Sequence, residues 1–153
     1  MEVLILNRRS SYDYEILEKF VAGIKLQGHE VKSLKNKNGK ILGSYVIERN
    51  EGFFWVNGYI EPWKNASKQS LIGYKSDRDR KLLLTRKQMQ EISLKKKQQK
   101  ATIVPTAILL DKRYIKLEIA LVKALRKYDK VAKKKERDEK RKIQRMVKEC
   151  NKE

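Results

Sequence analysis

The composition changes abruptly at Lys123, and this change constrains the fold more than any other feature of the sequence. From Lys123 to the end there is no glycine or proline and only one aromatic residue, Tyr128, while lysine and arginine dominate. A segment of this kind cannot bury enough apolar surface to form a core of its own. We therefore divide the chain into a one-domain body, residues 1–122, and a basic tail, residues 123–153, which is disordered or helical when bound.

Short alternating segments predict a body made mainly of β-strands. Residues 14–26 place apolar side chains at mostly even spacing, which is typical of a half-buried strand. Residues 45–47 and 53–56 flank a loop in which Asn50 and Gly52 are predicted to take the positive φ of a hairpin turn. A final hairpin is predicted from residues 103–110 and 114–122. The body is then most simply antiparallel, and an OB-like β-barrel with two or three flanking helices is the leading candidate.

Helical patterns are fewer. Val31 and Leu34 lie three residues apart and predict a short helix over residues 28–34, and good helix formers predict a second helix from Leu82 to about Lys97. Residues 61–79 form a polar surface loop in this interpretation, with Lys64, Lys68 and Lys75 exposed. The tail is expected to be helical from about Ala132, with a narrow apolar stripe of Ile143, Met146, Val147 and Cys150.

The charge of the chain points to a polyanionic partner. Lysine and arginine number 38 against 19 acidic residues, a formal net charge of +19. A membrane surface is not favoured as this partner, because the sequence has no long helix with a face rich in Trp, Phe or Leu. No apolar stretch approaches the ~20 residues that cross a bilayer. With Cys150 as the only cysteine, no intramolecular disulfide can form. The N-terminus has no presequence pattern, so we expect a cytoplasmic protein.

The sequence contains no recognisable catalytic pattern, and we expect neither an enzyme nor a cofactor. It has no glycine-rich phosphate loop and no group of residues at metal-ligand spacing. We interpret His29 as a structural or solvated residue. Aromatic side chains can stack on unpaired bases, but we expect Phe53 and Trp55 to pack in the core, whereas Tyr59 and Trp63 could do either. Together with the basic runs, these aromatics indicate an RNA-binding protein.

A set of motifs in one order resembles the SsrA-binding protein (small protein B) family over nearly the whole chain. The motifs are Asn7-Arg8-Arg9, Asp13-Tyr14, residues 20–24, the G-x-E-V-K-S motif of residues 28–33, residues 44–46, the R-K-L-L-L motif of residues 80–84, Val104-Pro105 and Tyr128-Asp129-Lys130. The resemblance implies an OB-like barrel that binds transfer-messenger RNA (SsrA) around its D-loop and elbow. It also implies a tail that enters the empty mRNA channel and decoding region of stalled ribosomes for trans-translation.

By match, the resemblance places Asn7 and Leu83 at RNA-binding positions and Asp129 and Lys130 in the tail motif used on the ribosome. With the neighbouring motif residues and basic runs, it predicts the following residues and partners. The residues assigned to RNA binding are Asn7, Arg8, Arg9, Glu30, Lys32, Arg80, Lys81 and Leu83, with Arg80 and Lys81 as phosphate contacts. Those assigned to the ribosome are Lys127, Tyr128, Asp129, Lys130, Lys133, Lys134, Lys135, Arg137, Lys140 and Arg141. Partners are the RNA, the small ribosomal subunit with its 16S-type rRNA, and indirectly elongation factor Tu and alanyl-tRNA synthetase through the RNA. We expect a monomer in the cytoplasm of a bacterium or in an organelle.

Some positions depart from the family pattern, and two other functions stay open. Val21 stands where the family usually has an acid that accepts hydrogen bonds from RNA bases, Ala120 and Ala124 replace glycines, and Val131 replaces an arginine. The first alternative is a ribosomal protein or another rRNA-binding assembly factor. The second is a nuclease that uses Glu30, Asp79 and Asp129 as metal ligands.

Overall fold

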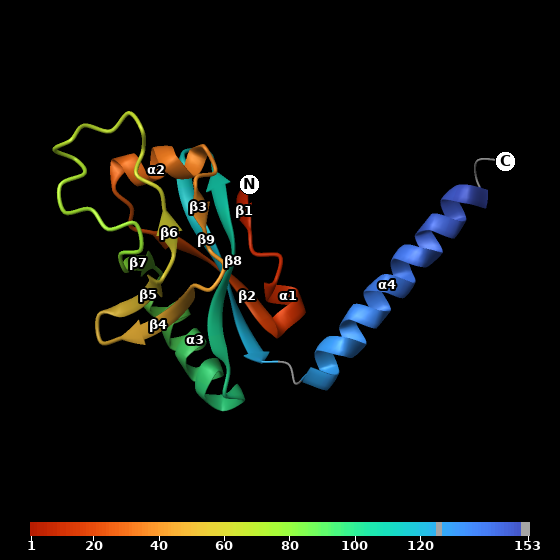
Figure 1. Cartoon of the computed structure of the whole chain (residues 1–153). Helices are drawn as coiled ribbons and strands as arrows, with labels where there is room; N and C mark the ends of the chain where they lie inside the picture. The colour runs from red at the N-terminus through yellow and green to blue at the C-terminus, as the bar shows by residue number, and fades with distance from the viewer. Residues whose placement is uncertain (125–126, 151–153) are drawn as a thin grey trace.

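The computed structural model describes the backbone of residues 1–124 and 127–150, and the side chains in these ranges except those of Ser11, residues 127–133 and residues 149–150. The elements of the body form one unit with a main hydrophobic core and a smaller second cluster. The last helix extends away from them (Figure 1). In chain order the elements are β1 (Glu2–Leu6), α1 (Ser10–Asp13), β2 (Tyr14–Ile24), α2 (Gly28–Lys35), β3 (Gly39–Lys40), β4 (Tyr45–Arg49), β5 (Gly52–Val56), β6 (Tyr59–Ile60), β7 (Arg80–Leu83), α3 (Arg86–Gln99), β8 (Thr102–Asp111), β9 (Tyr114–Ala124) and α4 (Lys127–Cys150).

Within the described residues, seven strands form one antiparallel sheet whose pairings close a ring. The order is β1-β8-β4-β5-β7-β2-β9, and an additional pairing joins β9 back to β8. Strand β8 pairs with β9 along one edge, while its other edge pairs with β4 at Ile103 and with β1 from Ala107 to Leu110. The predicted mainly-β, antiparallel body is therefore confirmed.

Several predicted elements are confirmed, and four were missed. The strand over residues 14–24, the helix over residues 28–35 and both hairpins are present. In the first hairpin Gly52 has a φ of +132°, but Asn50 does not have the positive φ that the sequence predicts for it. Helix α1 and the strands β1, β3 and β6 had no predicted counterpart. The partner of β1 is β8, about 100 residues further along the chain, so no local pattern identifies it.

The helix predicted from Leu82 was wrong at its beginning. Residues Arg80–Leu83 form β7, which pairs with β5 and β2, and burial alternates along it with Arg80 and Leu82 inside. The tertiary pairing overrides the helix propensity of three consecutive leucines. Helix α3 begins only at Arg86, where the Thr85 side chain accepts from the backbone N–H of Gln88 and the Gln88 side chain accepts from that of Thr85.

The core fills the inside of the ring. Phe53 and Trp55 from β5 are 1% and 0% exposed, which confirms that they pack in the interior. Leu117 and Ile119 from β9 face them in the same cluster, and Ile92 is the buried residue through which α3 covers it. The pairing of the strands around this core therefore fixes the positions of the residues that face outward.

The tail helix starts earlier than predicted and contacts the body near its base. Strand β9 continues to Ala124, and α4 begins at Lys127 instead of Ala132. Its contact with the body is at α1, where the Arg137 guanidinium lies 5.6 Å from the centre of the Tyr12 ring. The stripe residues Ile143, Met146 and Val147 are exposed, whereas the side chain of Cys150 lies outside the described residues. None of the described helices is long and apolar enough to cross a membrane.

Candidate nucleic-acid interface

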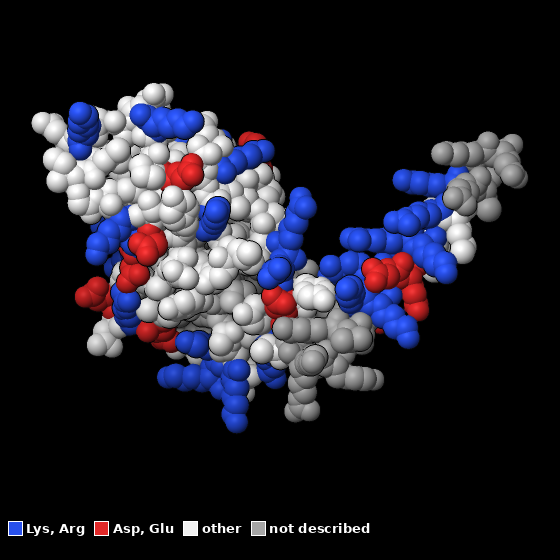
Figure 2. Space-filling view, viewed as in Figure 1, with Lys and Arg blue, Asp and Glu red and all other residues white. Residues whose placement is uncertain are grey.

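Basic side chains are distributed differently on the body and on the tail. On the face shown in Figure 2 they are scattered over the body and interrupted by acidic groups, while they project along most of α4. The described tail residues assigned to the ribosome are all exposed, namely Lys134, Lys135, Arg137, Lys140 and Arg141. The side chains of Lys127, Tyr128, Asp129, Lys130 and Lys133 lie outside the described residues.

Three neighbouring strands of the body present a second basic surface, built by register. In β2 and β9, Val21 lies opposite Glu118 and Gly23 lies opposite Lys116. On the other side of β2, Gly23 lies opposite Leu83 of β7, and the backbone N–H of Lys25 donates to the carbonyl of Lys81. Residues opposite each other share a face of a sheet. We call this face the β7–β2–β9 surface; its residues are Lys19, Val21, Gly23, Lys25, Lys81, Leu83, Lys116 and Glu118.

The centre of the β7–β2–β9 surface is apolar and its border is cationic. Leu83 is 55% exposed and Val21 is 37% exposed, on either side of Gly23. Lys25 and Lys81 are exposed and make no ion pair within the described residues. Free ammonium groups around an apolar centre suit a partner that carries phosphates on its outside and flat rings within. The predicted residues Lys81 and Leu83 are thus brought together on this surface.

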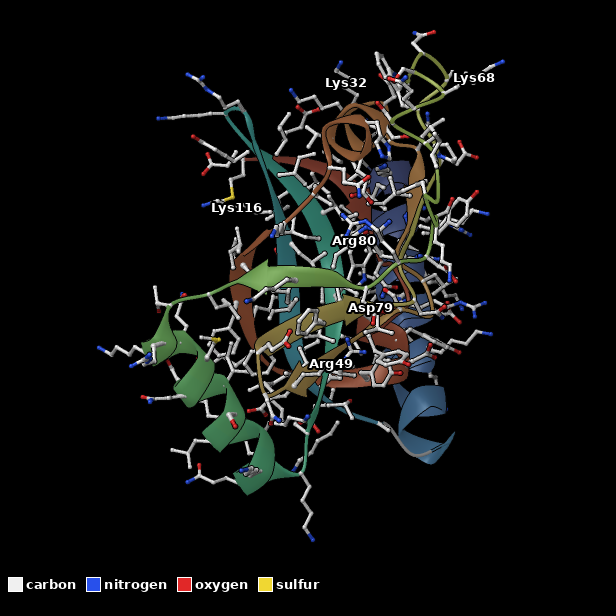
Figure 3. All side chains as sticks on the ribbon, turned by 90° about the vertical axis from the view of Figure 1, so that its left-hand side faces the viewer. Lys32, Arg49, Lys68, Asp79, Arg80 and Lys116 are labelled. Atoms are coloured by element: carbon white, nitrogen blue, oxygen red, sulfur yellow. The ribbon has the colours of Figure 1, made fainter. Side chains whose placement is uncertain are left out.

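The side chains of Glu30 and Arg80 lie away from every exposed surface of the described residues, which does not fit the direct RNA contact predicted for them. Both side chains are completely buried, and Arg80 lies inside the body in Figure 3, whereas Lys116 lies at its edge. The Arg80 Nε and Nη2 atoms lie 2.8 and 2.7 Å from Glu30 Oε2, and Arg78 binds Oε1. Burial opposes the charge on Glu30, but its hydrogen bonds from Arg78, the Gln27 backbone and Arg80 outweigh it and lower the pKa of Glu30.

The Glu30–Arg80 pair shapes the long loop between β6 and β7. Arg80 donates to the carbonyls of Gly58 and Ser76 at 2.9 and 2.8 Å, and Tyr74 donates to Glu30 at 3.1 Å. The acceptor of the Tyr74 hydroxyl is Oε2, the same oxygen that Arg80 binds. Burial and the nearby Glu30 charge raise the pKa of Tyr74 to about 12. His29, the only histidine, packs edge-on against Tyr74 and bonds the Gln27 side chain, which agrees with a structural role. The ion pair therefore organises the scaffold behind the surface.

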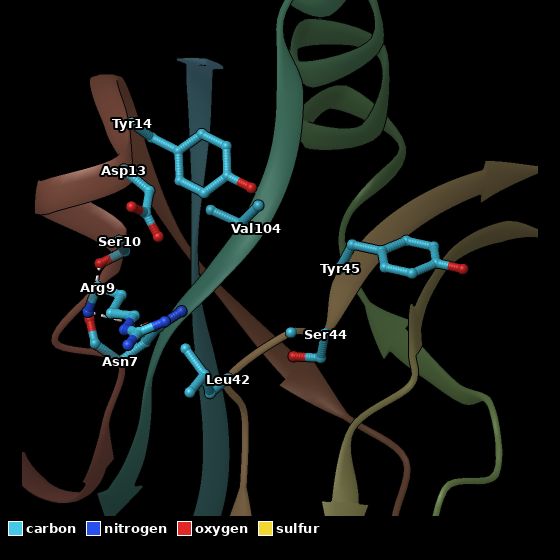
Figure 4. Close-up of a pocket in the computed structure, with 10 residues that line it drawn as sticks. Asn7, Arg9, Ser10, Asp13, Tyr14, Leu42, Ser44, Tyr45 and Val104 are labelled. Atoms are coloured by element: carbon cyan, nitrogen blue, oxygen red, sulfur yellow. Dashed lines mark hydrogen bonds between the residues drawn. The ribbon is translucent and has the colours of Figure 1, made fainter. Parts of the chain in front are cut away.

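Asn7, Arg8 and Arg9 lie beside α1, near the base of the tail. Asn7 and Arg9 line a hollow of about 300 Å³ together with Tyr14, Ser44 and Tyr45 (Figure 4). The Asn7 amide donates to the carbonyl of Pro105 at 3.0 Å, and its oxygen accepts from the backbone N–H of Arg9 at 3.3 Å. Asn7 thus joins β8 to the start of α1. The side chains of Arg8 and Arg9 are exposed, so this region is a further basic area of the body, apart from the β7–β2–β9 surface.

Lys32 is separated from the β7–β2–β9 surface. Its ammonium group lies 4.3 Å from the centre of the Trp63 ring, in a different hollow that also includes Ser67 and Ser70. One face of Trp63 is therefore already covered by a cation. Tyr59, for which either role was expected, is 37% exposed.

The metal-ion nuclease finds no support in this geometry. The carboxylate of Glu30 is held by two arginines, and that of Asp79 lies 2.8 Å from Arg49. Among the residues that the structure describes, no three His, Cys, Asp or Glu side chains group as they would around a metal ion. The third expected ligand, Asp129, has its side chain outside these residues.

Comparison with known proteins decides the family. The family model described as "SmpB protein" matches residues 4–149. The chain belongs to the SmpB family. Its SmpB-family relatives include the "SsrA-binding protein" of Mesomycoplasma hyopneumoniae, 40% identical over 97% of this chain and 98% of the relative. The "SsrA-binding protein" of a Sulfurihydrogenibium species is 40% identical over 96% of this chain and 95% of the relative.

A solved structure agrees with the SmpB assignment. It is described as "tmRNA-SmpB: a journey to the center of the bacterial ribosome" and is 34% identical, with a TM-score of 0.65 over 80% of this chain and 85% of that one. At this identity the agreement extends beyond the general fold. The mainly-β body with its large antiparallel sheet is thus shared with an SmpB structure.

Half of the β7–β2–β9 surface was not predicted from the sequence. Lys19, Lys25, Lys116 and Glu118 were not among the predicted residues. A usable signal was present, because Lys19, Val21, Gly23 and Lys25 occupy alternate positions of a strand that the sequence predicts. Their connection to Leu83 required the pairing of β2 with β7, which the sequence does not display.

Proposed function

We propose that this protein binds transfer-messenger RNA and delivers it to stalled ribosomes for trans-translation. The observation that carries the proposal is the β7–β2–β9 surface, an apolar centre bordered by four lysines, in a chain whose SmpB relatives are named as SsrA-binding proteins. Of these lysines, Lys25 and Lys81 make no ion pair within the described residues. The similarity to a protein solved as tmRNA-SmpB on the bacterial ribosome supports the same pair of partners. No separate observation favours a permanent ribosomal protein.

In this proposal the body and the tail have different tasks. The closed ring of strands acts as an OB-like barrel that recognises the shape and the unpaired bases of the RNA. The exposed lysines and arginines of α4 neutralise 16S-type rRNA phosphates in the empty mRNA channel and decoding region. The protein works as a monomeric, non-enzymatic adaptor in the bacterial cytoplasm. Elongation factor Tu and alanyl-tRNA synthetase meet it only through the RNA.

A single apolar residue tests the RNA-binding surface. Replacing Leu83 by aspartate puts a negative charge at the centre of the surface without disturbing the core, because this side chain is already 55% exposed. We expect the affinity for the tRNA-like domain of transfer-messenger RNA to fall at least tenfold, since the change removes apolar contact and repels phosphates. Equilibrium binding to a labelled transcript measures it.

Leu94 supplies the matched control. It is 58% exposed on α3, outside the β7–β2–β9 surface, so Leu94→Asp makes the same chemical change elsewhere. We expect Leu94→Asp to bind within twofold of the unmodified protein. Equal loss of affinity in both variants would show that charge alone matters and would remove the surface from the proposal.

A further inference from the structure

One carboxylate lies within the β7–β2–β9 surface. Glu118 faces outward from β9, directly opposite Val21 on β2, and Lys116 precedes it on the same face by two residues. The other polar members of the surface are all lysines. An acid at this position weakens the attraction of the surface for phosphates, so its presence calls for another explanation.

The Glu118 side chain is held in place from two sides. The hydroxyl of Thr106, on β8, donates to Oε1 at 2.9 Å, and the Lys19 ammonium lies 3.4 Å from the same oxygen. The side chains of Glu118 and Lys19 are 23% and 54% exposed, and an ion pair this open stabilises a fold little. Within the described part of the chain, Oε2 has no hydrogen bond or ion pair. A positioned carboxylate with one free oxygen is thus available to a partner.

The chemistry of a carboxylate selects among the four bases. An ionised carboxylate only accepts hydrogen bonds. The Watson–Crick edges of adenine, cytosine and uracil place an acceptor next to each donor, and that acceptor would repel it. Guanine alone presents two adjacent donors on this edge, the N1–H and the N2 amino group. Unpaired bases in RNA loops are recognised on these edges.

We propose that Glu118 recognises an unpaired guanine of the bound RNA by accepting hydrogen bonds from its N1–H and N2 amino groups. The inference rests on the proposed function and adds a base-specific contact to it. The neighbouring apolar strip of Val21, Gly23 and Leu83 provides a surface for the base or its ribose. Lys19 leaves Oε1 for a phosphate of the same nucleotide strand. Oε1 keeps the hydrogen bond from Thr106 and has a second lone pair, so it and the free Oε2 can both accept from the guanine.

The absence of a side chain at Gly23 keeps this strip level. A Cβ atom added at Gly23 would lie 3.1 Å from the Cβ and 3.5 Å from the carbonyl oxygen of Leu83. The space between β2 and β7 therefore has no room for a larger residue unless Leu83 moves. The bound base would rest on backbone at this point, beside the carboxylate.

The experiment combines a protein change with atomic changes in the RNA. The probe is a synthetic tRNA-like domain in which each unpaired guanine is replaced, one at a time, by inosine, which lacks the N2 amino group. At one position inosine should weaken binding of the unmodified protein about tenfold, whereas 7-deazaguanine, which keeps both donors, should not. Glu118→Gln should bind the guanine form about tenfold more weakly and show no further loss with inosine at that position. Glu2→Gln, an exposed change on β1 outside the surface, should behave as the unmodified protein.

A guanine-free RNA separates recognition from charge. Glu118→Gln removes a negative charge, so its affinity for oligouridine should stay equal or rise while its affinity for the tRNA-like domain falls. If affinity for both RNAs rises, or if no inosine position affects the unmodified protein, the role of Glu118 is refuted. If the unmodified protein binds the domain no better than oligouridine, the proposed function itself fails.

Discussion

Arg80 shows that a basic residue of this chain can stabilise the fold through a buried ion pair instead of contacting a phosphate. It lies in the run Arg78-Asp79-Arg80-Lys81, where composition alone makes every basic residue a candidate for phosphate contact. The alternation of β7 turns Lys81 outward and Arg80 inward to Glu30, about 50 positions earlier in the chain. The sequence motifs could therefore predict that these positions matter, but not that Glu30 and Arg80 act on the scaffold.

Breaking this pair should destabilise the fold. Glu30→Gln leaves a fully buried guanidinium without its counter-charge, which we expect to lower the free energy of unfolding by about 3–5 kcal/mol. Urea denaturation at pH 7 measures it. The control is Glu61→Gln, a change of an exposed residue in the loop after β6. Its free energy of unfolding should stay within about 0.5 kcal/mol of that of the unmodified protein. A similar small effect for Glu30→Gln would mean that the buried pair does not support the body.

The pH dependence of stability follows from the same carboxylate. The pKa of Glu30 is lowered from an ordinary value of 4.5, so its contribution to stability is fully present above that pH and is lost as the pH falls through the lower, folded-state value. We expect the free energy of unfolding of the unmodified protein to decline below pH 4.5 more steeply than that of Glu30→Gln. Parallel curves for the two proteins would contradict this assignment.

At the level of elements, local patterns predict what local contacts stabilise. The β4–β5 and β8–β9 hairpins and helix α2 were predictable because turn residues and alternation lie close together in sequence. Strands β1 and β7 were not, because each is held by partners distant in the chain. The β7–β2–β9 surface depends on one of these distant pairings, which explains why motifs located Leu83 but not Lys25 or Glu118.

The boundary between β7 and α3 rests on Thr85. Its hydroxyl accepts from the backbone N–H of Gln88 at 3.2 Å, which satisfies one of the free donors at the start of the helix. Thr85→Ala should therefore lower the free energy of unfolding by about 1 kcal/mol. Thr85→Ser keeps the hydroxyl and should change it by less than half as much. Chemical denaturation of the three proteins compares them, and equal losses for alanine and serine would contradict the capping role.

At the scale of the whole molecule, two basic surfaces occupy different parts of the chain. The β7–β2–β9 surface is fixed by strand register, whereas the charges of α4 project from a helix that contacts the body at α1. Composition predicted this division near Lys123, and the end of β9 at Ala124 lies close to it. Only the pairing of the strands shows where on the body a polyanion would bind.

The salt dependence of RNA binding should report individual lysines of the body. Each phosphate neutralised contributes roughly −0.7 to −0.9 to the slope of log affinity against log salt concentration. Lys81→Met should make this slope about one unit less steep, because Lys81 is exposed and makes no ion pair among the described residues. Lys97→Met, an exposed change on α3, should leave the slope unaltered. If the two variants change the slope equally, the contribution of a lysine to RNA binding does not depend on its position in the body.

The measurement that most directly tests the separate tasks of body and tail compares RNA binding with peptide tagging in one reconstituted system. The proteins are the full chain, Leu83→Asp and a chain ending at Ala124, assayed on ribosomes stalled on an mRNA without a stop codon. We expect the shortened chain to bind the tRNA-like domain within about threefold of the full chain but to support no tagging, whereas Leu83→Asp loses both. Loss of RNA binding in the shortened chain, to the same extent as tagging, would contradict this expectation.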